Sequence, residues 1–291
     1  MWTFADALVD PRYSQDAADR MGDHGLRSTA EFLLLGPLRV RKTGSFVSLG
    51  GSRQQTLFAH LCLNANRHIT VERLMEAVWG EAAPPSARKN IQLYVSRLRK
   101  VLDTVNGADA TDGVRLETTS DGYLLTLGRH GLDLARCRLL ADRGRELLRE
   151  GDAGQAAALL GEACRTWRGE ALSGLSNTVP IRAEVARIAQ FRLSVTCDYF
   201  TAQLRVGRYA EMVPDLAHSV TLYPYQERLH GHLMEALWRS GRREEALAAY
   251  ALAYRRLVDD VGMEPGRSLR ALHREILADS GGTDSGTVFP E

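Results

Sequence analysis

The chain has 291 residues, 44% of them hydrophobic and 25% charged, which excludes a largely disordered chain and is enough for two domains with buried cores. The formal net charge is only +1, but residues 31–130 hold 13 Lys and Arg against 9 Asp and Glu, a net +4 that leaves −3 for the remainder. A basic module beside a slightly acidic one favours a nucleic-acid-binding domain joined to a protein-facing domain.

The cysteines and the apolar segments exclude two further classes. No CxxC pair occurs among the four cysteines, which argues against a zinc knuckle and favours reduced thiols in the cytosol. No apolar run reaches membrane-spanning length, and we find no signal peptide. We therefore expect a cytoplasmic protein without a membrane partner.

Residues 1–30 are polar and of mixed charge, and we expect a disordered extension there. The folded part begins with an extended segment, Phe32–Val40, broken at Gly36-Pro37. Phe46–Leu49 is a second short strand, ended by two glycines. Together these segments predict a small antiparallel sheet.

Two short helices follow the predicted sheet. Residues 53–64 place Leu57, Phe58 and Leu61 at helical spacing, and Cys62 lies on the same inward face. Thr70 can cap a second helix that runs to Trp79 and ends at a glycine.

The next segment, Pro84–Lys100, predicts a longer helix with an apolar back and a basic front. It carries five basic residues and no acidic one, and its two prolines suit the start of a helix. The back is formed by apolar residues within about 60° of arc, and the front by polar and basic ones. The back comprises Ile91, Val95, Leu98 and Leu102, and the front comprises Ser86, Lys89, Asn90, Leu93, Ser96, Arg97 and Lys100.

Such a front matches the chemistry of the DNA major groove. Arg and Lys pair with guanine, Asn pairs with adenine, and a small apolar side chain such as Leu93 can touch a thymine methyl. A basic helix face that is simply solvated or salt-bridged is the alternative. Two short helices and then a longer basic one form the helix-turn-helix layout, which favours DNA binding.

A β-hairpin is predicted directly behind the basic helix. Val114–Glu117 and Tyr123–Leu127 alternate like strands around an Asp-Gly turn. A hairpin in this place is a wing, and its hydroxyl groups suit phosphates: Thr118, Thr119 and Ser120.

These motifs resemble a known family. The runs LFAHLCLNANRHITVERLMEAVWG, PPSARKNIQLYVSRLRKVL and ETTSDGYLLTL are similar to the winged-helix DNA-binding domain of the Streptomyces antibiotic regulatory protein family. The runs DLARCRLLADRGRELLREGD and RLVDDVGMEPGRSLRALHREIL resemble the bacterial transcriptional activation domain that follows in those proteins. The resemblance covers roughly residues 31–278, so we expect neither a receiver domain nor a nucleotide-binding domain in this chain. Phosphorylation control of the receiver type is therefore not implied.

The resemblance implies roles for individual residues. Lys89, Asn90 and Arg97 stand where related domains reach bases or nearby phosphates. Residues at backbone-contact positions are Arg53, Trp79, Arg99 and Lys100. Arg88 and Arg99 lie nearer the core side, so for them ion pairs with Glu72, Glu76 or Glu81 are the alternative. Leu124 stands where response regulators often place Arg, which argues against minor-groove reading by the wing.

From Leu132 onward the chain is expected to be all helical. Leu132, Ala135, Leu139, Leu140 and Leu147 pattern a first helix, and further helices are expected over residues 156–167 and 181–206. Residues recur at an offset of 34, which is the period of tetratricopeptide repeats, and such stacked helix pairs bind proteins. The recurring residues are Ala202, Gly207, Arg208 and Glu211, matched by Ala236, Gly241, Arg242 and Glu245.

No catalytic constellation is found. His230 and His232 are two apart, so a helix points them to different faces, and paired acids such as Asp259-Asp260 are interpreted as solvated charge. We expect no enzyme activity, no cofactor and no metal site.

The sequence therefore predicts a mainly α fold with small β-sheets, namely a winged helix-turn-helix domain followed by an all-α tetratricopeptide-like domain. The expected divisions are an extension (1–30), a DNA-binding domain (31–128), an activation domain (129–279) and a disordered tail (280–291). The resemblance implies a nucleoid-associated activator of a secondary-metabolite gene cluster. It would bind promoter direct repeats of double-stranded DNA as a homodimer and recruit RNA polymerase holoenzyme with its sigma factor. A helical-repeat adaptor without specific DNA binding is the alternative.

Overall fold

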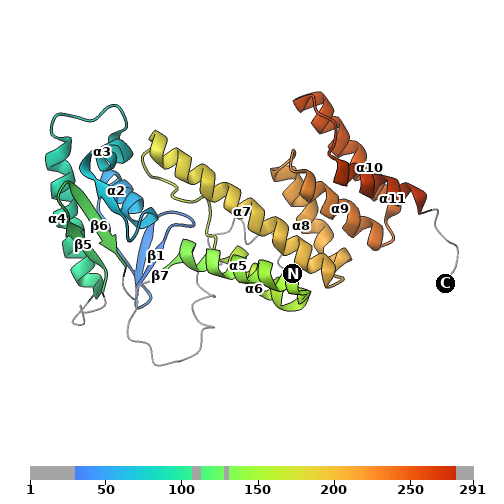
Figure 1. The fold of residues 1–291 in the computed structure, drawn as a ribbon, viewed down its shortest axis with the longest axis horizontal. Helices are drawn as coiled ribbons and strands as arrows, with labels where there is room; N and C mark the ends of the chain where they lie inside the picture. Colours follow the sequence, from blue (N-terminus) through green and yellow to red (C-terminus); the bar gives the residue numbers. More distant parts are fainter. Residues whose placement is uncertain (1–29, 107–112, 128–130, 280–291) are drawn as a thin grey trace. The chain divides into compact units, whose positions relative to one another are not determined.

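A computed structural model of the chain describes residues 30–106, 113–127 and 131–279 (Figure 1). The predicted tail, and all of the predicted extension except Ala30, lie outside the described residues. Within the described ranges, no helix is both long and apolar enough to cross a membrane.

The described chain divides into two compact units. The N-terminal unit takes the described residues up to Glu146 together with Ala158–Thr196. The C-terminal unit takes Leu147–Ala157 and the described residues from Cys197 onward. Part of the segment predicted as the activation domain is therefore packed with the winged helix.

A four-stranded sheet opens the N-terminal unit. The antiparallel strands β1 (Ala30–Leu33), β2 (Arg39–Lys42) and β3 (Ser45–Val47) form the predicted small sheet. A fourth strand, β7 (Gly131–Leu132), pairs parallel with β1, giving the order β3-β2-β1-β7. The expectation of helix from Leu132 onward was therefore wrong at its first residue, because β1 supplies a partner for this edge.

The winged helix-turn-helix follows as predicted. Helices α2 (Ser52–Leu63) and α3 (Val71–Trp79) pack on each other, and both contact α4 (Ala87–Asn106). Helix α4 extends beyond Leu102, the last residue of the predicted apolar back. The second sheet has the order β4-β6-β5, from β4 (His68–Thr70), β5 (Arg115–Thr118) and β6 (Gly122–Thr126). Figure 1 shows α4 beside the β5–β6 hairpin. Strand β4 was not predicted.

The Asp133 carboxylate connects the first sheet to the helices that follow it. Its oxygens accept hydrogen bonds from the backbone N–H groups of Leu34 (2.8 Å) and Leu35 (2.9 Å), just past β1, and from that of Leu134 (2.7 Å). Arg168 Nη2 lies 3.5 Å from the same carboxylate. Burial raises the pKa of the Asp133 carboxyl, while these backbone donors and the Arg168 charge oppose the rise.

Three helices follow β7. They are α5 (Asp133–Glu150), α6 (Ala153–Arg165) and α7 (Val179–Arg205). The predicted apolar face of α5 was partly wrong, because Leu139 is 72% exposed and the buried stripe instead runs through Leu134, Cys137 and Ala141. The close approach of α6 explains this, since the Cα of Gly144 faces Leu160 so closely that a Cβ would lie 2.6 Å from the leucine side chain.

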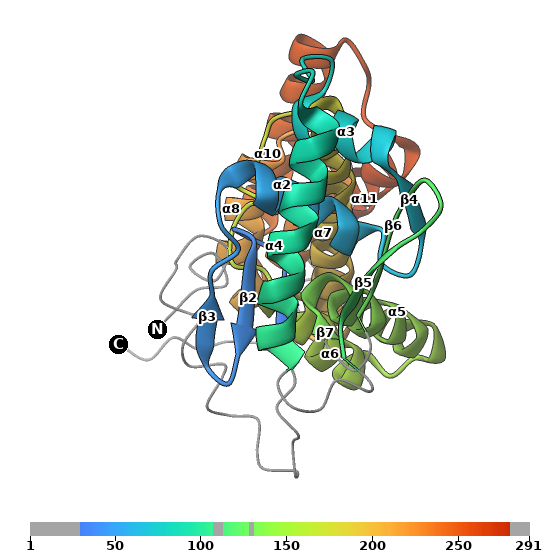
Figure 2. The ribbon, with the colours of Figure 1, turned by 90° about the vertical axis from the view of Figure 1, so that its left-hand side faces the viewer.

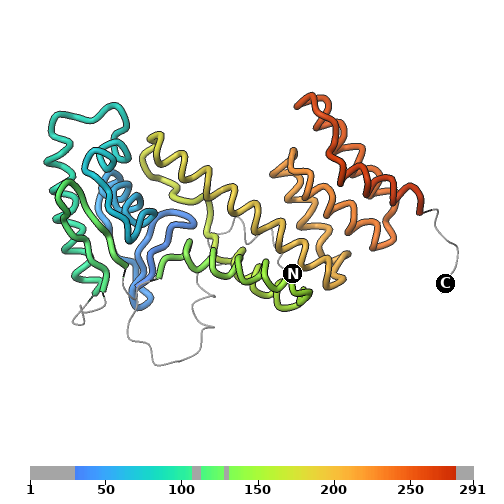
Figure 3. The backbone as a smooth tube through the Cα atoms, in the orientation of Figure 1, coloured from blue at the N-terminus to red at the C-terminus, as the bar shows by residue number. Residues whose placement is uncertain are grey.

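The C-terminal unit is built from stacked helices. It contains α8 (Tyr209–Leu222), α9 (Glu227–Arg239), α10 (Arg243–Arg255), the π-helical segment η2 (Arg256–Val261) and α11 (Arg267–Ala278). Helix α9 packs against α8, α10 and α11, and Figure 3 shows these helices as consecutive hairpins.

The two predicted repeat turns share one backbone geometry. Gly207 and Gly241 adopt φ values of 87° and 76°, which favour glycine. The residue after each glycine, Arg208 or Arg242, donates its N–H to the carbonyl five residues earlier, at 3.1 Å and 2.9 Å. Because the same hydrogen bonds recur 34 residues apart, the repeat predicted from the sequence is present in the fold.

A partly buried polar cluster stabilises the start of this unit. Arg228 Nη2 lies 2.8 Å from Asp198 Oδ1 and donates to Thr201 Oγ1 at 2.9 Å. His232 Nε2 lies 3.2 Å from the same hydroxyl. Burial, and then the nearby Arg228 charge, lower the pKa of His232 from 6.5 to about 4.

We expect Asp133→Ala to lower the free energy of unfolding by about 3 kcal/mol, because buried backbone donors and the Arg168 guanidinium lose their acceptor. Urea denaturation followed by circular dichroism measures the loss. Asp142→Ala is the control: its side chain is 72% exposed in a surface pair with Arg145, so the expected change is below about 1 kcal/mol. Equal losses in both variants would contradict the role given to Asp133.

We expect His232 to make the chain acid-labile. Because its folded-state pKa of about 4 lies below the ordinary 6.5, its contribution is present above pH 6.5 and is lost as the pH falls toward 4. The difference amounts to about 3 kcal/mol between neutral pH and pH 4. In His232→Gln, which does not titrate, the fall in unfolding free energy over this range should be smaller by that amount. Parallel pH profiles for the two proteins would refute the assignment.

Candidate nucleic-acid interface

The back of α4 is fully packed. Ile91, Val95, Leu98 and Leu102 are each at most 2% exposed and face α2 and α3. Burial of four branched apolar side chains fixes the rotation of the helix about its own axis. The predicted apolar back is therefore confirmed, and the direction of the opposite face is determined by it.

The front of α4 is open. Figure 2 shows the helix running along the near side of the N-terminal unit, with no labelled element of that unit in front of it. Leu93 is 45% exposed, and Asn90, which is half-buried, donates from Nδ2 to Ser86 Oγ at 3.2 Å. The other predicted front residues are exposed: Ser86, Lys89, Ser96, Arg97 and Lys100.

The charged groups on this front are free to meet an anion. Within the described ranges, Lys89, Arg97 and Lys100 form no ion pair. They lie at i, i+8 and i+11, so the three cations follow one side of the helix. Arg53 is exposed on α2, with its guanidinium 6.0 Å from the Trp79 ring centroid.

Two other arginines of α4 are already engaged within the fold. Arg88 forms an ion pair with Glu72 at the start of α3, which is the alternative that the sequence left open for it. Arg99 donates to the Leu116 carbonyl and to Thr118 Oγ1, both at 2.8 Å, instead of pairing with an acidic residue. Both side chains therefore hold α4 against its neighbours in this structure.

The wing is fixed at its tip. Asp121 Oδ1 lies 2.9 Å from His68 Nε2, and the Asp121 carbonyl accepts a hydrogen bond from the N–H of Val71 at 3.0 Å. Thr118 and Ser120 are exposed, whereas Thr119 Oγ1 is buried without a hydrogen-bond partner among the described residues. Two of the three predicted wing residues are therefore exposed, although Thr118 Oγ1 already accepts a hydrogen bond from Arg99 and Ser120 Oγ donates one to Asp121.

The Trp79 side chain is packed inside the domain and is not exposed to a DNA partner. It is 9% exposed and stacks on Tyr94, with ring centroids 6.2 Å apart. Its indole N–H is buried without a partner in the described part of the chain. The side chain supports the junction of α3 and α4 in this structure, and a contact from its indole N–H to DNA would require local movement.

Two basic residues near the front were not selected from the sequence. Arg67 lies in the turn before β4, and Arg73 lies in the first turn of α3, beside the residue that pairs with Arg88. Both are exposed. The signal that could have found them is the pair of basic residues flanking the predicted cap Thr70, since cations here suit DNA phosphates.

The fold and this open, cationic helix define a winged helix-turn-helix protein. Residues 47–124 match the model described as "Transcriptional regulatory protein, C terminal", and residues 132–277 match "Bacterial transcriptional activator domain". With both domains and the relatives described next, the chain belongs to the Streptomyces antibiotic regulatory protein family.

The relatives differ in length. Regulatory protein DnrI of Streptomyces peucetius is 32% identical, over 88% of this chain and 96% of its own. Regulatory protein AfsR of Streptomyces coelicolor is 37% identical over 84% of this chain, which spans only 24% of AfsR. The solved structure of Mycobacterium tuberculosis EmbR in complex with a low affinity phosphopeptide has a TM-score of 0.82 and 31% identity. That match covers 87% of this chain and 66% of EmbR.

We expect Gly122→Ala to loosen the wing. A Cβ on Gly122 would lie 1.9 Å from the Ile69 carbonyl oxygen, so β4 and β6 must separate. The expected loss of unfolding free energy is about 2 kcal/mol, measured by thermal denaturation. Gly131→Ala is the matched control, because nothing lies within 4 Å of its added Cβ. A Gly122 variant as stable as this control would contradict the packing argument.

Proposed function

We propose that this chain is a sequence-specific transcriptional activator whose α4 enters the major groove of promoter DNA. Lys89, Asn90 and Arg97 read bases or nearby phosphates from the front of the helix. Residues 31–128 form the DNA-binding domain. Leu93 touches a thymine methyl, and Ser86 and Ser96 lie beside it on the same front. The remaining predicted contacts hold the helix on the sugar–phosphate backbone: Arg53, Trp79, Arg88, Arg99, Lys100, Thr118, Thr119 and Ser120.

The observation that carries the proposal is the contrast between the two sides of α4. The back is buried and the front is open, with three cations that make no ion pair among the described residues. Because no acidic residue of the described chain pairs with Lys89, Arg97 and Lys100, nothing within it competes with DNA phosphates for these cations. Neutralising phosphates with such groups releases counterions, which gives binding that falls steeply with salt.

The finer parts of the proposal concern the target and the partners. The family supports a secondary-metabolite gene cluster as the target. Promoter direct repeats about one helical turn apart would place two protomers on the same DNA face. Residues 129–279 would then present the bound homodimer to RNA polymerase holoenzyme and its sigma factor, because stacked helix pairs offer extended surfaces for protein partners. This role would place the protein in the cytoplasm, associated with the nucleoid.

We expect Arg97→Ala and Asn90→Ala each to weaken specific binding by about 1–3 kcal/mol, because each removes a base contact, while non-specific binding is nearly unchanged. Mobility-shift titrations against the upstream region of neighbouring biosynthetic genes and against scrambled duplexes measure both terms. Arg165→Ala, which removes an exposed arginine of α6 in the same unit, is the control and should bind like the unaltered protein.

Equal losses on both duplexes would make Arg97 and Asn90 phosphate contacts rather than specificity residues. Elution of the unaltered protein from DNA-cellulose at the lowest salt would instead favour the helical-repeat adaptor.

A further inference from the structure

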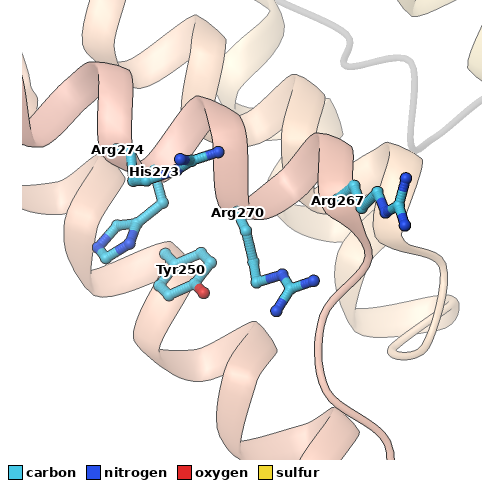
Figure 4. A pocket seen from close by; sticks show the side chains of 5 residues that line it. All are labelled: Tyr250, Arg267, Arg270, His273 and Arg274. Carbon is cyan, nitrogen blue, oxygen red and sulfur yellow. The ribbon is translucent and has the colours of Figure 1, made fainter.

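A basic pocket lies in the C-terminal unit, outside everything used for DNA binding. It has a volume of about 470 Å³ and is lined by side chains of α10 and α11, shown in Figure 4. They are Tyr250, Arg267, Arg270, His273 and Arg274. This volume falls in the usual range of small-molecule sites.

The cations of the pocket come from one face of one helix. Arg267, Arg270 and Arg274 follow one another at i, i+3 and i+7 along α11, so their side chains share that face. Among the described residues, Arg267 and Arg274 form no ion pair, whereas Arg270 Nη1 lies 3.1 Å from Glu264 Oε2. One carboxylate therefore offsets one of three guanidinium charges.

Two other charged groups, one at each end of α11, are already engaged within the fold. Glu227 accepts the N–H of Gly266 at 2.6 Å, at the start of the helix. Arg243 donates to the carbonyls of Ile276 and Leu277, at 2.9 Å and 3.0 Å, at its end. Neither group forms an ion pair with Arg267 or Arg274, the two unpaired arginines of the pocket.

A flat wall completes the pocket. The rings of Tyr250 and His273 stack with their centroids 3.7 Å apart and their planes within 5°. Figure 4 shows the Tyr250 hydroxyl on the side of Arg270, so a hydrogen-bonding group stands beside that cation.

We propose that this pocket binds a phosphate group, free or carried on a small organic molecule. The two unpaired guanidinium charges match the charge of about −1.5 to −2 of a phosphate monoester at neutral pH. A guanidinium group can donate two parallel hydrogen bonds to two phosphate oxygens. A phosphate has enough oxygens to pair with more than one guanidinium in this way, whereas a carboxylate pairs with only one. A ligand held between α10 and α11 would also stabilise that helix pair. The proposal is independent of DNA binding.

The test is isothermal titration of the full chain with three probes: inorganic pyrophosphate, adenosine monophosphate and adenosine. We expect saturable binding of at least one phosphate compound and none of adenosine. The double variant Arg267→Gln/Arg274→Gln should weaken it by at least about tenfold. Arg255→Gln, which removes an exposed arginine of α10 outside the lining, is the matched control and should leave it unchanged.

The three probes distinguish an organic phosphate from a free one, and the variants distinguish the pocket from the front of α4. Tighter binding of adenosine monophosphate than of pyrophosphate would assign the pocket to an organic phosphate, and the reverse order to a free phosphate. Equal affinity of the double variant and the unaltered chain would overturn the proposal, as would a loss seen only in Lys89→Gln/Arg97→Gln, which would place the phosphate on the front of α4. No saturation at millimolar probe, or saturation by an acidic peptide alone, would also overturn it. If the double variant unfolds, Arg274→Gln alone gives the same comparison.

Discussion

The Asp133 carboxylate is the constraint on which the N-terminal unit depends. Its oxygens accept hydrogen bonds from the first backbone N–H group after β1 and from the first turn of α5, and they lie near the Arg168 guanidinium. One buried carboxylate therefore connects three separate segments of the chain. The backbone adds to this connection, since the N–H of Arg168 donates to the Leu35 carbonyl at 2.7 Å. A buried carboxylate is tolerated only where such donors surround it. The winged helix is thus built into a larger packed unit instead of being joined by a free linker.

That anchoring explains how α4 can keep one side bare. Its back is held by apolar burial, its first turn by the pair between Arg88 and Glu72, and its middle by Arg99 on β5. Groups that satisfy each other inside the fold fix the position and rotation of the helix. The remaining cations need no partner for folding, and the energy of meeting phosphates remains available for binding.

Much of this arrangement was predictable because its causes are local. Apolar spacing of 3.6 residues located α2, α3 and α4, and the recurrence of Gly207 and Gly241 at an offset of 34 located the repeat, in which both glycines adopt positive φ. Strands β4 and β7 were missed because two or three residues carry no period, and each becomes a strand only through a distant partner. The face of α5 was misjudged because Leu139 is exposed while Cys137 and Gly144 are buried. Small residues at a tight helix contact leave no apolar signal.

The contacts that each arginine makes were the feature least predictable from the sequence. Arg88, Arg97 and Arg99 are within twelve residues of one another, yet one is paired with Glu72, one is free of ion pairs in the described chain and one bridges to a strand. These differences depend on which acceptors the tertiary fold brings within 3–4 Å, which helical spacing alone does not determine. The same holds for α11, where Glu264 offsets Arg270 but not Arg267 or Arg274. In both places, the cations that the fold leaves without acidic partners are the ones able to meet an external anion, and the two sites differ in what surrounds them. The front of α4 is an open stripe suited to a long polyanion, whereas the pocket between α10 and α11 has an aromatic wall on one side and suits a small one.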